Sequence, residues 1–136
     1  MKVAFTTEDL VHVNAHFGWA KKIAVYEITA DQGELLEVLE FGGVLEEDGN
    51  EDKLAPKVEA ITDCAILYVS AIGGSAAARV VSRNVHPVRV AETETIAGQI
   101  ERLQQVLQGT PPPWLRKAIN KGSDRIFNFE DEVVRG

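Results

Sequence analysis

Two histidines lie four positions apart within residues 11–19, and His16 directly precedes a Phe-Gly pair. Neutral imidazole is a good ligand for iron as well as zinc. Helical spacing would bring the rings of His12 and His16 together, but the residues around them do not form a helical pattern. The sequence therefore does not favour a metal shared by the pair. The alternative for each ring is a hydrogen-bonded, partly buried histidine.

A second candidate site is the run Gly73-Gly74-Ser75, which joins an apolar segment to a helical pattern. Backbone N–H groups at a helix start attract anions, and glycine lets a ligand approach the chain closely. The run lacks the Lys-Ser/Thr pair of a nucleotide-binding loop. The glycines could equally serve close packing of a helix on a sheet. Arg79 and Arg83 could add positive charge, with a solvated surface position as the alternative.

Cys64 is the single cysteine, so the chain has neither an intramolecular disulfide nor a zinc site built on paired cysteines. It precedes a predicted central strand, where a free cysteine usually behaves as a small buried hydrophobe. Ligation of a metal by Cys64 is the alternative. His86 precedes a proline at the start of a strand, and we interpret it as structural.

The composition fits one domain with a tail. The 136 residues are 45% hydrophobic and 26% charged, and no apolar run approaches the roughly 20 residues of a membrane helix. The N-terminus lacks the features of a secretory signal, so we expect a cytoplasmic protein without a membrane partner. A net charge of −7 argues against nucleic acid. Acidic side chains are concentrated in residues 46–52, which are expected to form a solvated loop.

Hydrophobic periodicity and turn residues predict the elements. Strands are expected near residues 2–6, 23–28, 35–41, 65–69 and 87–90, and helices near 54–61, 74–83 and 96–107, with a further short helix at 114–119. The long third helix should stop at Gly109, before three prolines. Trp114 is expected to dock on the core.

The order β-β-β-α-β-α-β-α predicts a single α/β domain with a mixed five-stranded sheet flanked by helices. Pairing the first strand with the fourth gives the strand order 3-2-1-4-5 and a ribonuclease-H-like architecture. We expect an α/β cofactor-binding domain over residues 1–109. Residues 110–136 would be a C-terminal extension with a short helix and a mobile end.

A ribonuclease-H-type hydrolase would need acidic side chains at strand ends to hold two divalent ions. The first strand carries none. Glu8, Asp9 and Glu92 follow strands but are ordinary loop acids. A metal-dependent nuclease or phosphatase is therefore a remote hypothesis that rests on fold analogy alone.

Four segments carry a resemblance to a known family: residues 14–18 (NAHFG), 63–81, 86–90 (HPVRV) and 111–115 (PPPWL). Together they resemble the nitrogenase iron-molybdenum-cofactor carrier family, in its small stand-alone form. The similarity runs from Lys2 to about Ile119. It implies an accessory protein of nitrogen fixation that is not an enzyme.

What the resemblance implies is transient binding of the iron-molybdenum cofactor or its iron-sulfur precursors, and their transfer between scaffold and assembly proteins. The family's histidine before Phe-Gly corresponds to His16, and its glycine pair to Gly73 and Gly74. We expect His16 to be the metal ligand, with support from Gly73-Gly74-Ser75 and Arg79 and with Cys64 as a candidate further ligand. A cluster that arrives with its own sulfides needs few protein ligands. The chain would be a monomer or weak dimer.

The second hypothesis is a protein-interaction module that binds no cluster itself. Its acidic loop and tail would dock on the cofactor assembly machinery. It predicts protein without cluster absorbance, and loss of partner binding when residues 122–136 are deleted.

Overall fold

The computed structural model describes residues 1–41 and 54–121. The predictions for the acidic run 46–52 and for the end of the chain beyond residue 121 fall outside these ranges. Within them the chain forms five strands and four helices. These are β1 (Lys2–Thr7), β2 (Lys22–Ile28), β3 (Gly33–Glu40), α1 (Leu54–Ala60), β4 (Ile66–Val69), α2 (Gly74–Ser82), β5 (His86–Arg89), α3 (Ile96–Gln108) and α4 (Pro113–Lys121).

The strands form one mixed sheet in the order β3-β2-β1-β4-β5. β1 pairs antiparallel with β2 and parallel with β4, so it is the strand at which the two halves of the sheet join. All four residues of β4 are buried, as its unbroken apolar run predicts for a strand covered on both faces. The predicted strand order and the α/β class are confirmed.

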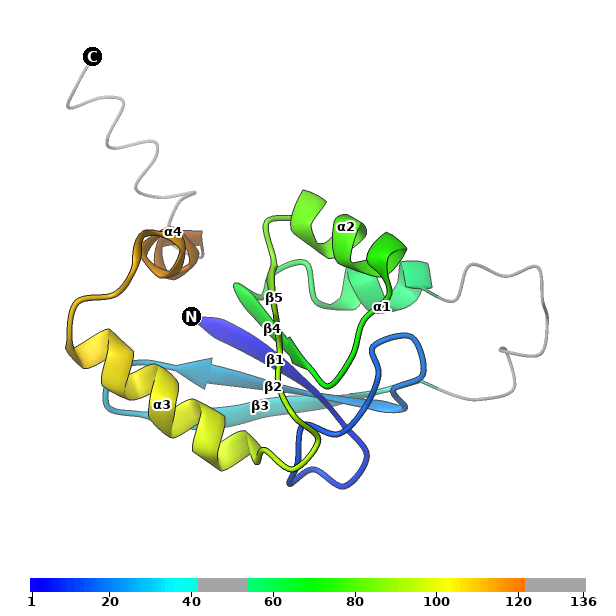
Figure 1. The fold of residues 1–136 in the computed structure, drawn as a ribbon, viewed down its shortest axis with the longest axis horizontal. Coiled ribbons are helices and arrows are strands. Elements are labelled where there is room, and N and C mark those ends of the chain that lie inside the picture. The colour runs from blue at the N-terminus through cyan, green and yellow to red at the C-terminus, as the bar shows by residue number, and fades with distance from the viewer. Residues whose placement is uncertain (42–53, 122–136) are drawn as a thin grey trace, which may run out of the picture.

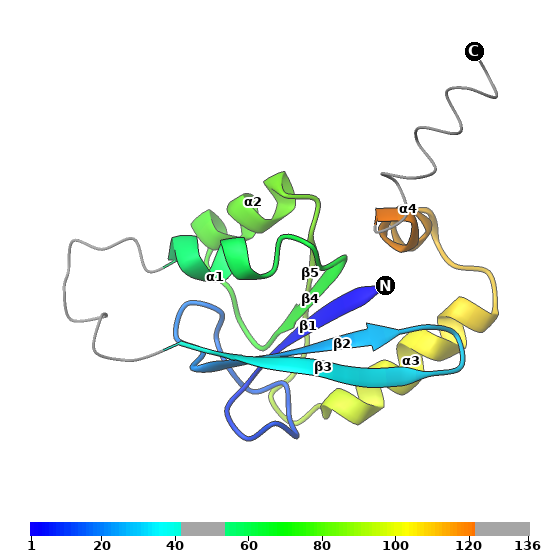
Figure 2. The same cartoon turned by 180° about the vertical axis from the view of Figure 1, so that it is seen from behind.

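Helices cover both faces of the sheet (Figure 1, with the reverse view in Figure 2). α1 and α2 bury Val58, Ile61 and Val80 against one face. α3 and α4 bury Leu103 and Leu115 against the other. The two apolar layers make the central strands a rigid frame, and the connections at the ends of the strands are free to carry function.

Local signals explain where the helices begin and end. Thr95 caps α3, its hydroxyl accepting the N–H of Gly98 at 2.9 Å, and the helix stops before Gly109 as predicted. Pro56 lies in the first turn of α1, where a missing N–H costs little. None of the described helices is long and apolar enough to cross a bilayer.

The C-terminal helix packs on the same core as α3. Leu115 and Ala118 are buried, and the Trp114 ring stacks on that of His86 with 4.0 Å between centroids. The Lys121 ammonium donates to the carbonyls of Cys64, Arg83 and Asn84 at 2.8–3.0 Å. Trp114 is 40% exposed and lies on His86 at the surface rather than in the core as expected, while the proposed domain boundary at residue 109 stays a prediction.

Candidate functional site

The loop between β1 and β2 carries both histidines on one exposed side. Burial alternates from residue to residue: Val13, Ala15 and Phe17 are buried, while His12, Asn14 and His16 are only partly so. We call His12, Asn14 and His16 the histidine ridge. A fully extended chain would separate the two histidine backbones by at most roughly 13 Å. Within the described part of the chain, no hydrogen bond or ring contact joins the two imidazoles, and no group of three or more ligands is arranged to hold a single ion.

The His16 end of the ridge is tied to the end of β4. The N–H of Phe17 donates to the carbonyl of Ala71 at 2.9 Å, and His16 and Ala71 form a parallel β-bridge. The buried hydroxyl of Thr6 donates to the carbonyl of Ala15 at 2.7 Å. These bonds bring His16 to the strand end from which the chain enters the glycine pair. The two stretches singled out in the sequence thus meet at one end of the sheet.

The His16 ring is fixed by its own turn. The N–H of Gly18 donates to Nδ1 at 2.9 Å, so Nδ1 is an acceptor and the neutral ring carries its proton on Nε2. A Cβ at Gly18 would lie 3.3 Å from the ring, which explains the glycine after Phe17. The neighbouring Trp19 is 66% exposed. In this geometry His16 presents an N–H donor rather than a lone pair.

The glycine pair, Gly73 and Gly74, is exposed, and no side chain of the described residues packs over it. Gly73 is the N-cap of α2 without a side-chain cap, and a Cβ added at Gly73 or Gly74 would meet nothing within 4 Å. Neither residue has a positive φ. The alternative that these glycines serve close helix-sheet packing is therefore wrong. Exposed backbone N–H groups at a helix start remain, and a ligand could approach them directly.

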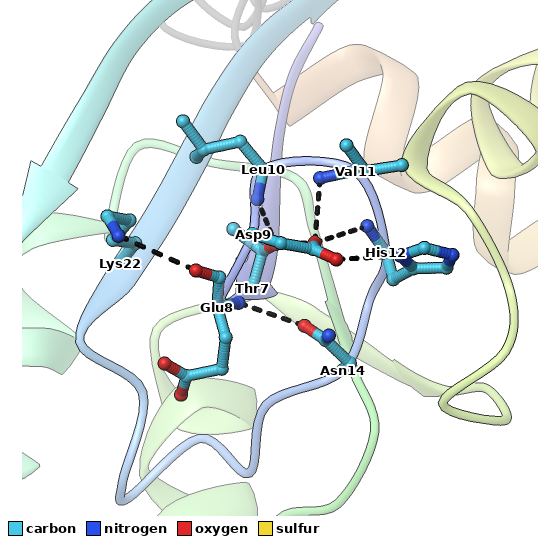
Figure 3. Close-up of polar contacts among 8 residues, drawn as sticks. All are labelled: Thr7, Glu8, Asp9, Leu10, Val11, His12, Asn14 and Lys22. Carbon is cyan, nitrogen blue, oxygen red and sulfur yellow. Dashed lines mark hydrogen bonds and ion pairs between the residues drawn. The ribbon is translucent and has the colours of Figure 1, made fainter.

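The His12 end of the ridge is built around Asp9 (Figure 3). One carboxylate oxygen of Asp9 accepts the backbone N–H groups of Val11 and His12 at 2.9 and 2.8 Å. The other lies 2.8 Å from Nδ1 of His12. Leu10 adopts a left-handed conformation, with φ of 66°, and its N–H donates to the hydroxyl of Thr7 at 2.8 Å. The turn is thus held by side chains that sequence periodicity does not reveal.

Asp9 sets the proton position on His12. The backbone N–H of His12 and then its ring N–H lower the pKa of the Asp9 carboxyl well below its usual range. An ionised carboxylate can only accept, so Nδ1 of His12 is the protonated nitrogen and Nε2 of the neutral ring carries the lone pair. The His12 side chain is 39% exposed. A β-bridge to Thr95 places it beside the start of α3.

Lys57 of α1 holds the turn that follows His16. Its ammonium is buried and donates to the carbonyls of Phe17 and Gly18 at 3.1 and 2.9 Å. It also lies over the ring of Phe41. Sequence reasoning missed Lys57, although its spacings of three from Leu54 and four from Ile61 put it on the same face of the predicted helix as these apolar residues.

The remaining predicted site residues are distributed differently. Ser75 is exposed in the first turn of α2, beside the glycine pair. Arg79 lies more than one turn further along and lines a small groove between α1 and α2. Cys64 is fully buried before β4, at the end of that strand away from Ala71. Burial raises the pKa of its thiol to about 12, which disfavours the thiolate that binds iron.

The described residues hold no group of three or more His, Cys, Asp or Glu side chains arranged to bind a metal ion. A separate cavity of about 320 Å³, lined in part by His86, Trp114 and Lys117, lies at the opposite end of the parallel strands. The structure therefore brings the backbone of His16 to Ala71, two residues before Gly73-Gly74-Ser75, and places Cys64 at the other end of β4.

Comparisons with known proteins agree with this fold. The family model for the dinitrogenase iron-molybdenum cofactor matches residues 1–106. The chain is 59% identical to the NifX protein of Herbaspirillum seropedicae, over 98% of this chain and 91% of that one. It is 44% identical to NifX of Sinorhizobium fredii, over 97% and 86% of the two chains. The crystal structure of PH0822 shares the fold, with a TM-score of 0.61 and 21% identity over 77% of this chain and 89% of that one.

The class that the fold and these matches define is a small α/β accessory protein of cofactor biosynthesis or handling, which is not a catalyst. The chain belongs to the dinitrogenase iron-molybdenum cofactor family, as the sequence resemblance implied. Its role thus falls within the biosynthesis or handling of that cofactor for nitrogen fixation.

Proposed function

We propose that this protein binds the iron-molybdenum cofactor, or an iron-sulfur precursor of it, and passes it between assembly proteins. The observation that carries the proposal is the β-bridge from His16 to Ala71, which lies two residues before the open glycine pair. A partly exposed imidazole and exposed backbone N–H groups at the same end of the sheet suit an anionic cluster. The family membership supports the same cargo.

The proposed binding site is sparse, and this suits a carrier. A preassembled cluster brings its own sulfide ligands, so one protein ligand and a few hydrogen-bond donors suffice to hold it. Few contacts also mean fast release, because each hydrogen bond to a charged group contributes only about 1.5–3 kcal/mol. In this scheme Nε2–H of His16 donates to a cluster sulfide or carboxylate oxygen. The N–H groups around Gly74 neutralise part of the remaining charge.

The test is an anaerobic titration of the full chain with isolated iron-molybdenum cofactor. We expect His16→Ala to weaken binding about tenfold or more, the loss of one hydrogen bond to a charged group. His16→Gln, which keeps an N–H donor, should bind more tightly than His16→Ala. His86→Gln is the matched control, because it removes a histidine at the other end of the sheet. Equal affinity of the wild type and His16→Ala would contradict the role of His16.

A second candidate function is docking of an assembly protein without cluster binding. Exposed apolar side chains beside the ridge favour it: Leu10 is 42%, Val11 52% and Trp19 66% exposed. Such side chains often mark protein contacts. Protein purified without oxygen from cofactor-making cells should then contain no iron, whereas the carrier should be brown and contain it.

The carrier proposal implies further properties of the protein. It would act in the cytoplasm, where thiols and iron-sulfur clusters stay reduced. Its partners would be the scaffold and assembly proteins that donate and receive the cluster. Such a carrier could work as a monomer or weak dimer, since the histidine ridge and the glycine pair lie on one chain.

A further inference from the structure

We propose that His12, oriented by Asp9, is the imidazole that coordinates a cluster iron, and that His16 instead contacts the cluster as a hydrogen-bond donor. The inference rests on the proposed cluster binding and says which histidine coordinates the cluster. It is drawn from the hydrogen bonds of the two imidazole rings. Both lie on the same ridge, but only one presents a lone pair to solvent.

The ring of His16 is the poorer ligand in this arrangement. Its Nδ1 accepts the N–H of Gly18, so a metal at Nε2 would need either the loss of a proton from the neutral ring or the rupture of that hydrogen bond. A metal at Nδ1 would displace the N–H of Gly18. Each route adds a free-energy cost to coordination by His16 that coordination by His12 avoids.

The ring of His12 has the arrangement found at metal-binding histidines. Such a histidine usually donates its second ring N–H to a carboxylate or carbonyl, which fixes the tautomer and makes the other nitrogen more basic. Asp9 supplies that carboxylate at 2.8 Å. Two backbone N–H groups hold the same carboxylate in place, so it cannot easily rotate away from the ring.

The metal that His12 binds is an iron atom of a preassembled iron-sulfur cluster rather than a free ion. One imidazole is too little for an isolated cation, and the described residues provide no further His, Cys, Asp or Glu cluster. Coordination replaces a labile ligand on iron by the Nε2 lone pair. It involves no oxidation, and no proton is released because Nε2 of neutral His12 is already unprotonated.

Asp9 acts as a positioning residue, and Asp9→Asn tests this role. The amide oxygen can retain the bonds from Val11 and His12 N–H, which keeps the turn. The amide nitrogen then faces Nδ1 as a donor and forces the neutral ring to carry its proton on Nε2. Outer-shell changes of this kind typically reduce metal affinity about 10–100-fold. We expect that loss for Asp9→Asn without a change in circular dichroism.

The deciding experiment is pulsed electron paramagnetic resonance of isolated iron-molybdenum cofactor, in a paramagnetic state, bound to ¹⁵N-histidine-labelled full-length protein. A coordinated imidazole gives a much stronger nitrogen hyperfine coupling than a hydrogen-bonded one. We expect the strong coupling in the wild type, His16→Gln and the control His86→Gln. We expect its loss in His12→Gln and Asp9→Asn, with at least about tenfold weaker binding.

Strong coupling retained in His12→Gln and lost in His16→Gln would overturn the inference and leave the carrier function standing. Bound cofactor with no strong coupling in the wild type would overturn it as well. Failure of the wild type to bind the cofactor at all would instead reject the proposed function. The same series of spectra therefore distinguishes failure of this inference from failure of the proposed function.

Discussion

His12 and His16 are the same residue type on the same exposed ridge, yet their surroundings place the ring proton on opposite nitrogens. Asp9 accepts from Nδ1 of His12, whereas Gly18 donates to Nδ1 of His16. One ring therefore offers a lone pair and the other an N–H. We infer from this difference that the contact made by Nδ1, more than exposure, determines which group each of these two rings offers to a ligand.

The two ends of the ridge also differ in what holds them. The His12 end is held by a side-chain carboxylate within its own turn, together with the β-bridge from His12 to Thr95. The His16 end depends on bonds from distant elements, namely the bridge to Ala71 and the buried ammonium of Lys57. Variants can therefore disturb one end and leave the other intact.

The largest effect is expected for Lys57→Met, which disturbs the His16 end alone. Removing the buried ammonium leaves the carbonyls of Phe17 and Gly18 without this donor, so we expect a loss of about 2–3 kcal/mol in the free energy of unfolding. Urea denaturation measures it. The NMR signals of the His16 ring should shift while those of His12 stay.

Lys21→Met is the control for Lys57→Met, because Lys21 is exposed and its replacement should change stability by less than about 0.5 kcal/mol. If Lys57→Met were as stable as Lys21→Met, the account of the His16 turn would be wrong.

Gly74→Ala should separate folding from binding at the His16 end. The added methyl meets open space, so we expect stability to rise by about 0.4–1 kcal/mol. The same methyl blocks the approach to the helix start and should weaken cofactor binding about tenfold, the loss of one hydrogen bond to a charged group. Gly109→Ala is the control at the end of α3. Unchanged cofactor affinity in Gly74→Ala would remove the glycine pair from the site.

The smallest effect is expected at Cys64, the third candidate ligand. With a pKa raised to about 12 by burial, its thiolate fraction at pH 8 is on the order of one in ten thousand. Iodoacetamide should therefore label the native protein very slowly and the urea-unfolded protein at the ordinary rate. Cys64→Ala should bind cofactor as the wild type does. Rapid labelling of the native chain, or a binding defect in Cys64→Ala, would return Cys64 to the site.

The fold could be predicted from the sequence because its signals are periodic. The apolar run that ends at Val69 predicts the central strand β4. The helical spacing of apolar residues that begins at Ile96 predicts α3, which ends before Gly109. Helical spacing is less reliable at α2, where Val81 falls beside Ala77 and Val80 on the apolar side of the pattern and is 54% exposed. That helix turns only part of the expected face toward the sheet.

The site could be predicted only in part. The approach of His16 to the segment before the glycine pair follows from strand order. Both segments come after neighbouring parallel strands, β1 and β4, whose carboxyl ends lie at the same end of the sheet. The roles of Asp9 and Lys57 depend on side-chain hydrogen bonds that have no periodic signal. For the same reason the sequence predicts no role for His12 beyond that of a hydrogen-bonded histidine, although its contact with Asp9 gives it the geometry of a ligand.

The most direct test is the proton position on the two rings in the protein without cluster. Long-range ¹H–¹⁵N correlation spectra at a pH where both rings are neutral distinguish a protonated from an unprotonated ring nitrogen. We predict protonated Nδ1 for His12 and protonated Nε2 for His16, and inversion at His12 alone in Asp9→Asn. The same tautomer for both rings, or no response of His12 to Asp9→Asn, would contradict the account.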